Sequence, residues 1–218
     1  MNKKYWSMSS VDRASPEVIE WYASEILPVA AQHPHVSRAW LLETQTHVED
    51  AGPNLPQLFA VYESRETDST EGVYVPDVAE WEGAPGPIEH PRTAVRELLA
   101  NLWFPAEGGE WWCSIRIDPL DTDDARDNWD ELEDWYTFRH IGETLVADGI
   151  HQGWRLGNEV MQSGPPTQHD HFRWAMYEQT KQEDMLLHVN KEPLQPIWFR
   201  FVDQESFGRG FHRVVGRA

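Results

Sequence analysis

The sequence is poor in cysteine, in basic residues and in long apolar runs. Cys113 is the only cysteine, so no disulfide can form within the chain, and its apolar neighbours in 111–115 predict a buried strand residue rather than a nucleophile. No segment approaches the roughly 20 apolar residues that a membrane helix needs, and the first residues lead into polar sequence rather than an apolar signal core. We therefore expect a cytoplasmic location.

The scarcity of basic residues limits the possible partners. The chain has 18 lysines and arginines against 37 acidic residues, a formal net charge of −19. A charge of this sign repels phosphate backbones and anionic lipid headgroups, so we expect neither nucleic acid nor a membrane as partner. The sequence also has no glycine-rich phosphate loop, no Gly-x-Ser-x-Gly motif and no dinucleotide fingerprint, and we expect no cofactor.

Two His-x-His triplets, at 33–35 and 169–171, are the candidates for metal ligands. Residues two apart on an extended chain project from the same face, as metal ligands would. Neither triplet has further ligands at a spacing typical of a metal site. We interpret both as surface histidines and expect no metal centre.

Aromatic residues are abundant, and they reveal an internal repeat. The chain has 12 tryptophans and 40% hydrophobic residues, enough to bury a core. The pair Trp21-Tyr22 recurs as Trp135-Tyr136, and Trp40 recurs as Trp154 at the same spacing. Further matches join Tyr5-Trp6 to 111–112, 59–63 to 174–178 and, more weakly, 92–96 to 213–217. The repeat predicts two units, 1–105 and 106–218, that meet at a turn containing proline and glycine.

Each unit has the pattern of a small α+β fold. Ser15-Pro16-Glu17 has the residues of a helix start, and Val18, Tyr22, Ile26 and Val29 recur at helical spacing as one buried stripe. Strands are predicted at 5–10, 36–43 and 58–63, followed in each unit by a second helix and a closing strand, at about 183–201 and 211–217 in the second unit. The order is β-α-β-β-α-β, which predicts two tandem ferredoxin-like units stacked sheet to sheet.

The helix containing the repeated aromatic pair carries a family resemblance. Residues 21–28 and 135–142 resemble the helix signature of the EthD-like branch of the dimeric α+β barrel superfamily, Trp-Tyr, three residues, His, one residue, Pro. The first copy keeps Pro28 but has Ile26 in place of the histidine, whereas the second keeps His140 and has Gly142 in place of the proline. The resemblance implies an intrachain dimeric α+β barrel with a pocket for an apolar small molecule between helices and sheet.

His140 is the candidate catalytic residue. It follows Tyr136 and Leu132 at helical spacing, which predicts that it continues the buried stripe of its helix. A buried imidazole can donate or accept a proton near neutral pH, as proton removal beside a carbonyl requires, although a structural core histidine is the alternative. Tyr136 is the candidate supporting residue, and further candidates for substrate contact are Trp135, Arg116, Arg155, Arg173 and Tyr177.

These residues support two functional hypotheses. The first is a cofactor-independent enzyme that acts on a hydrophobic aromatic or polyketide-like molecule; the resemblance implies a cyclase, isomerase, dehydratase or monooxygenase. The second is a non-catalytic protein of the same fold that binds a small molecule or serves as a scaffold. For the three arginines, pairing with nearby carboxylates is the alternative to substrate binding. A homodimer of the whole chain is a possible assembly.

Overall fold

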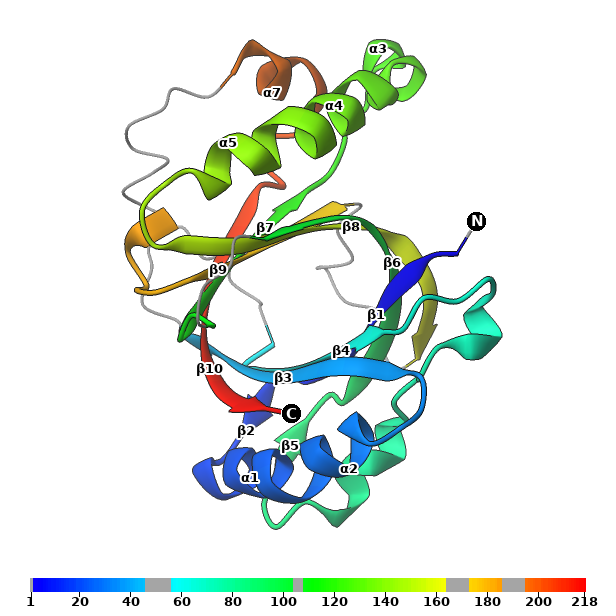
Figure 1. Cartoon of the computed structure of the whole chain (residues 1–218), viewed down its shortest axis with the longest axis vertical. Coiled ribbons are helices and arrows are strands. Elements are labelled where there is room, and N and C mark those ends of the chain that lie inside the picture. The colour runs from blue at the N-terminus through cyan, green and yellow to red at the C-terminus, as the bar shows by residue number, and fades with distance from the viewer. Residues whose placement is uncertain (1, 46–55, 104–107, 164–172, 186–194) are drawn as a thin grey trace.

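A computed structural model describes residues 2–45, 56–103, 108–163, 173–185 and 195–218. Eight strands form one closed barrel in the order β1-β4-β3-β10-β7-β9-β8-β6, and every neighbouring pair is antiparallel (Figure 1). In chain order the strands are β1 (Lys4–Val11), β3 (Val36–Gln45), β4 (Leu58–Ser64), β6 (Arg92–Trp103), β7 (Trp111–Ile117), β8 (Ile150–Ser163), β9 (Arg173–Gln179) and β10 (Gly208–Arg217).

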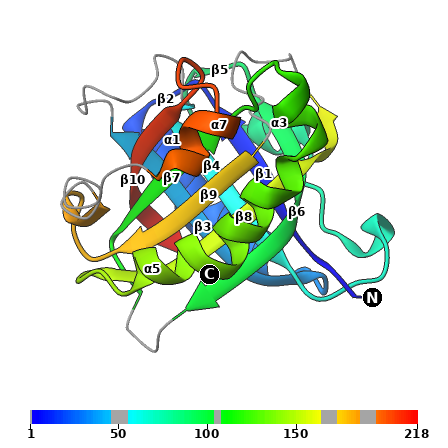
Figure 2. The same cartoon turned by 90° about the horizontal axis from the view of Figure 1, so that it is seen from above.

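Each half of the chain supplies four adjacent strands, β6-β1-β4-β3 from the first half and β10-β7-β9-β8 from the second. The halves join through the β3–β10 and β6–β8 pairs, so the two sheets close edge to edge and leave no edge of the barrel unpaired. The helices of the two halves lie on opposite sides of the barrel (Figure 1), and in the view from above the helices of the second half lie in front of the strands (Figure 2). The expected mixed α+β barrel is confirmed. The predicted boundary at 105/106 lies outside the described residues.

The strand pairing places the two halves in matching register at most of the repeated residues. Trp6 of β1 lies opposite Arg96 of β6, and Trp112 of β7 lies opposite His212 of β10. Arg96 therefore corresponds to His212, and the expected match of 92–96 with 213–217 is wrong by several residues. The arginines of the two closing strands have the same spacing but do not occupy equivalent positions. Strand pairing, rather than arginine spacing, sets which residues correspond.

Tryptophans fill the barrel interior. Trp6, Trp40, Trp112 and Trp154 point inward, and their ring centroids are 4.6–6.2 Å apart. Glu63 lies among them, and its Oε2 accepts hydrogen bonds from the indole nitrogen of Trp154 at 3.3 Å and from that of Trp6 at 3.5 Å. Because successive strand residues alternate between faces, the outward residues form separate cores beneath the helices.

Both main helices contain a π-helical turn at the repeated aromatic pair. The first helical segment comprises α1 (Pro16–Trp21), a π turn (Tyr22–Ile26) and α2 (Leu27–Ala31), and it begins at Pro16 as predicted. The second comprises α3 (Asp123–Asp127), α4 (Trp129–Trp135), a π turn (Tyr136–His140) and α5 (Ile141–Leu145). A π turn adds one residue to the helical repeat and shifts the buried stripe by one position.

That shift corrects two expectations. Leu27 and Ala30 are buried where Ile26 and Val29 were expected, and Val29 is 69% exposed. In the second helix Ile141 occupies the fully buried position in place of His140, which is only partly buried. Helical spacing of 3.6 residues predicted the stripe correctly up to the π turn and wrongly beyond it.

The second helix expected in the first half is absent from that half, all of whose residues between β4 and β6 the structure describes. Short 3₁₀ turns, Thr70–Gly72 and Val78–Gly83, occupy this stretch, together with β5 (Ile88–Glu89), which pairs with β2 (Arg13–Ala14). Prolines 76, 85 and 87 disfavour a continuous helix here. In the second half α7 (Pro196–Phe201) forms part of the expected helix, and 186–194 lie outside the described residues.

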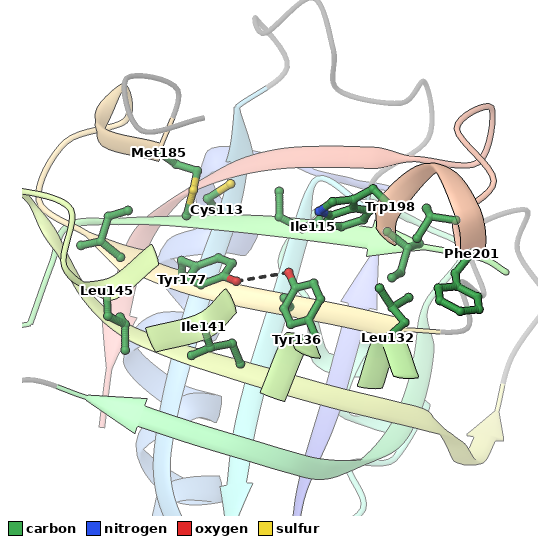
Figure 3. Close-up of a cluster of buried hydrophobic side chains, with 14 of the residues drawn as sticks. Cys113, Ile115, Leu132, Tyr136, Ile141, Leu145, Tyr177, Met185, Trp198 and Phe201 are labelled. Atoms are coloured by element: carbon green, nitrogen blue, oxygen red, sulfur yellow. Dashed lines mark hydrogen bonds between the residues drawn. The ribbon is translucent and has the colours of Figure 1, made fainter. Parts of the chain in front are cut away.

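Cys113 is fully buried beneath the second helix (Figure 3). Burial raises the pKa of its thiol to about 12, which keeps the sulfur protonated and unreactive. The prediction of a buried strand residue is confirmed. Among the described residues, no helix has the length and apolar character that crossing a membrane requires.

Candidate active site

His140 lies in an aromatic enclosure at the end of the π turn. Its ring stacks on Trp135 with centroids 4.6 Å apart and planes 18° apart. Tyr136 and Trp198 approach it edge-on, at 4.9 Å and 6.1 Å. An ordinary α-helix would turn residues five apart away from each other, so the π turn is what brings Trp135 and His140 face to face. The arrangement leaves a partly exposed imidazole with aromatic rings on several sides.

A buried tyrosine pair lies beneath this enclosure. The hydroxyls of Tyr136 on the helix and Tyr177 on β9 are 3.2 Å apart, as Figure 3 shows. Burial raises the pKa of both hydroxyls, and for each of them it is the largest cause. Both phenols therefore remain protonated and can serve as hydrogen-bond donors, but not as bases, near neutral pH.

Two of the candidate arginines share one carboxylate beside the tyrosine pair. Arg155, only 1% exposed, places its guanidinium carbon 4.0 Å from the centroid of the Tyr136 ring and its Nη2 3.3 Å from Glu133 Oε1. Arg173 donates from Nε to the same oxygen at 2.7 Å, and Trp129 donates from Nε1 at 2.6 Å. Glu133 therefore holds the two arginines in place, as the alternative of carboxylate pairing predicts.

Arg116 lies apart from the other candidate residues. His140, Trp135, Tyr136, Tyr177, Arg155 and Arg173 lie together between the second helix and the outer face of β8 and β9. Arg116 alternates on β7 with the outward residues Ile115 and Ile117, and therefore points into the barrel. The sequence pattern identified it as an arginine in an apolar strand but could not say which face of the sheet it occupies.

The corresponding place in the first half has different chemistry. The Tyr22 and Tyr62 hydroxyls are 2.7 Å apart, and Tyr22 also donates to Glu80 Oε2 at 3.2 Å. Tyr74 donates to the other oxygen of Glu80, and Trp81 stacks on Tyr22 with ring centroids 4.4 Å apart. Burial raises the pKa of the Glu80 carboxyl, while the tyrosine hydrogen bonds oppose the rise. The repeat did not identify Glu80 or Trp81, because the 3₁₀ turn that carries them has no match among the described residues of the second half.

An open groove of about 510 Å³ lies beside the first helix, where Pro16, Glu20 and Ser24 of the helix face Glu43 of β3 and Val215 of β10. It is lined by none of the candidate residues. His33 and His35 lie near the surface with ring centroids 5.2 Å apart, and His169 and His171 are outside the described residues. In the described part of the chain, no three His, Cys, Asp or Glu residues gather as a metal site.

A second buried histidine, His212, lies inside the barrel on β10. Its Nε2 is 2.8 Å from the Ser114 hydroxyl, and its Nδ1 is 3.1 Å from the Thr44 hydroxyl. Thr44 donates to the carbonyl of Pro56 at 2.6 Å and so accepts from Nδ1–H, which leaves Nε2 to accept from Ser114. Burial, and secondarily the charge of Arg116, lower the pKa of His212 to about 3. The repeat did not point to this histidine, because the residue at the corresponding place in the first half is Arg96.

The neutral state of His212 predicts a contribution to acid lability. Its pKa falls from an ordinary 6.5 to about 3 on folding, so the unfolded chain binds the proton first as the pH falls. The stabilisation it provides is complete above pH 6.5 and is lost as the pH falls toward 3. We expect the free energy of unfolding, measured by urea titration, to fall less between pH 7 and pH 4.5 in His212→Gln than in the wild type. Equal losses in the two proteins would contradict a depressed histidine pKa.

The topology and the helices of the two halves define a dimeric α+β barrel, and solved structures share this fold. An anthrone oxidase-like protein aligns over 99% of this chain and 93% of its own, with a TM-score of 0.60 and 12% identity. A candidate chlorite dismutase aligns over 99% of this chain and 96% of its own, with a TM-score of 0.59 and 13% identity. A candidate monooxygenase of Fusobacterium nucleatum aligns over 99% of this chain and 94% of its own, with a TM-score of 0.54 and 8% identity. The sequence matches no family model and no curated protein.

Proposed function

We propose that this protein is an enzyme acting on an apolar aromatic or polyketide-like small molecule, with His140 as general acid and base. The observation that carries the proposal is the placement of a partly exposed imidazole among Trp135, Tyr136 and Trp198. Aromatic walls suit a planar, apolar substrate, and a histidine can exchange a proton near neutral pH. The π turn that creates the enclosure is a feature often found at functional sites.

The surrounding residues divide into substrate contacts and supporting residues. Trp135 and His140 are accessible enough to touch a substrate, since both are only partly buried. Tyr136 is fully buried and holds the imidazole edge-on, so we assign it a positioning role together with Tyr177. Arg155 and Arg173 keep the tyrosine pair in place through Glu133. Of the candidates for substrate contact, Trp135 is the one whose ring forms a side of the enclosure around His140.

Two of the similar structures carry oxidase or monooxygenase names, which suggests the first reaction to test. An anthrone has an acidic C–H beside its aromatic rings, and a general base can remove that proton. The resulting carbanion reacts with molecular oxygen, and the overall reaction converts one anthrone and one O₂ into one anthraquinone and one water. His140 would take the carbon-bound proton in this scheme, and the protein would need no redox cofactor.

The test is oxygen consumption and quinone formation with anthrones and related hydroxyquinones. We expect His140→Ala to reduce kcat by roughly 10²–10⁴-fold, the usual contribution of general acid–base catalysis. Ile26→Ala is the matched control, because Ile26 occupies the corresponding position in the first helix, and it should keep wild-type turnover. Full activity in His140→Ala would exclude the general-base role, and loss of activity with EDTA would exclude a metal-independent reaction.

A non-catalytic binding protein is the second candidate, favoured by the absence of the histidine from the first half. This alternative predicts that aromatic acids or quinones raise the Tm saturably and that the protein does not convert them into a product. Under this alternative His140→Ala would change affinity only. Substrate turnover by the wild type would decide against it.

We further propose that the barrel arose by tandem duplication of a ferredoxin-like unit of the EthD-like type, with units 1–105 and 106–218. The strand orders of the two halves, the paired tyrosine contacts and the π turns at equal places support this origin. The missing second helix in the first half is a departure from that unit. Three further expectations stay predictions: a cytoplasmic location, the absence of nucleic acid and membrane partners, and a homodimer.

A further inference from the structure

We propose that the inside of the barrel near Arg116 binds the carboxylate of an apolar organic acid, at a site separate from His140. The proposal rests first on the burial and the missing hydrogen-bond partners of the Arg116 guanidinium. Its side chain is 1% exposed, and it makes no hydrogen bond or ion pair with any residue that the structure describes. Burying an unpaired guanidinium is costly, so a bound anion would remove a large penalty.

The charged groups around Arg116 do not neutralise its positive charge. Asp118 lies close enough to favour the charged form of Arg116. Arg96, the other inward cation nearby, donates to Glu159 at 2.6 Å and to the carbonyl of Gly157 at 3.0 Å. His212 is neutral, as its lowered pKa requires. One positive charge is therefore available, which suits a monoanion better than a phosphate with two charges.

A second unpaired donor lies on the neighbouring strand. Trp174 of β9 lies directly opposite Arg116 in the strand register, and the guanidinium carbon is 5.8 Å from the centroid of its indole ring. Its Nε1–H is buried and has no acceptor within the described part of the protein. A carboxylate has two oxygens, so it can accept from the guanidinium and from an indole N–H together. Two unsatisfied donors on facing residues point to one shared acceptor.

The walls around these donors are apolar. Phe59, Leu156 and Met176 belong to the same buried interior cluster as Trp174. The hydrocarbon part of an organic acid could pack against these apolar side chains, whereas an inorganic anion could not. The ligand class is therefore an apolar monocarboxylate, for which benzoate and octanoate are suitable probes.

The arrangement is specific to one half of the barrel. Ser10 lies opposite Phe59 in the first half, in the register that Arg116 and Trp174 occupy in the second. On the neighbouring strand, Gly208 lies directly opposite Arg116, and a Cβ on this glycine would come within 2.8 Å of the guanidinium carbon. The glycine leaves room for the guanidinium over β10, which holds the charge inside the barrel.

The experiment compares benzoate and octanoate with their neutral amides, using the full chain and both calorimetry and Tm. We expect saturable binding of the acids, and binding of benzamide and octanamide weaker by about tenfold or more, because an amide gives the guanidinium no charge to pair with. In ¹H–¹⁵N spectra, the indole signal assigned through Trp174→Phe should shift on addition of benzoate. An equal response to acid and amide, or an unmoved indole signal, would overturn the proposal.

Variants separate this site from the others. Arg116→Met has similar length and no charge, should fold because it removes an unpaired buried cation, and should lose benzoate binding. Arg155→Lys is the matched control, an equally buried cation outside the barrel, and should keep it. His140→Ala should also keep binding, so this proposal and the proposed function can fail independently. Retained affinity in Arg116→Met, or chloride and phosphate binding as tightly as benzoate, would refute an apolar carboxylate site.

Discussion

Replacing Trp154 with alanine is expected to lower the free energy of unfolding by about 3–5 kcal/mol, the usual cost of truncating a fully buried tryptophan. Trp154 is completely buried in the barrel, stacks on Trp112 with centroids 4.6 Å apart and contacts Trp6 at 5.2 Å. The substitution also removes an indole donor from Glu63. Because both sheets contribute to this cluster, the cavity would weaken the packing between the two halves of the chain.

Urea unfolding followed by far-UV circular dichroism measures this loss without depending on tryptophan emission. Phe138→Ala is the control, because Phe138 is a large aromatic of the second helix that is 82% exposed. Its substitution should change stability by no more than about 0.5 kcal/mol. Comparable losses in the two variants would show that the tryptophan cluster does not hold the barrel together.

Removing the Glu133 carboxylate is expected to cost about 3 kcal/mol, at the lower end of the range for breaking a buried ion pair, because Glu133 is partly exposed. Glu133→Ala leaves the guanidinium of Arg155, which is almost completely buried, without its carboxylate and takes an acceptor from Arg173 and Trp129. Arg155 also lies against the Tyr136 ring, so the change should reach the tyrosine pair beneath His140.

Glu143→Ala provides the matched control, since Glu143 pairs with Arg139 on the exposed side of the same helix. Exposed pairs of this kind contribute about 0.2–1 kcal/mol. The double variant Glu133→Ala/Arg155→Met should recover part of the loss, because it removes the unpaired charge along with its partner. If the double variant is as unstable as the sum of the single ones, the two side chains are not energetically coupled.

The outcome at the two main helices shows how far local pattern could predict the fold. Pro16 begins the first helix as its position after Ser15 indicated, and Val18 and Tyr22 are buried as their spacing required. Beyond Tyr22 the stripe shifts, because the π turn adds a residue that no local preference announces. The same shift places His140 beside the buried stripe, where it can stack on Trp135.

The interior of the barrel was less accessible to sequence reasoning. Arg116, Arg155 and Arg173 had the same signature, an arginine in an apolar strand, yet two pair with Glu133 outside the barrel and one lies inside it. His212 and its contacts with Ser114 and Thr44 join strands from opposite halves of the chain. Strand register decides which residues meet, and register depends on how both sheets close.

By itself, the sequence determined the repeated aromatic pairs, the start of the first helix, the apolar strands and the position of the single motif histidine, because these follow from local preference and the period of the hydrophobic pattern. Only the tertiary structure decided the register in which the eight strands close, the π turn that sets the environment of His140, and the enclosure of Arg116 without an ion-pair partner among the described residues. These features depend on contacts between residues far apart in the chain, whose geometry is set by strand pairing across the two halves.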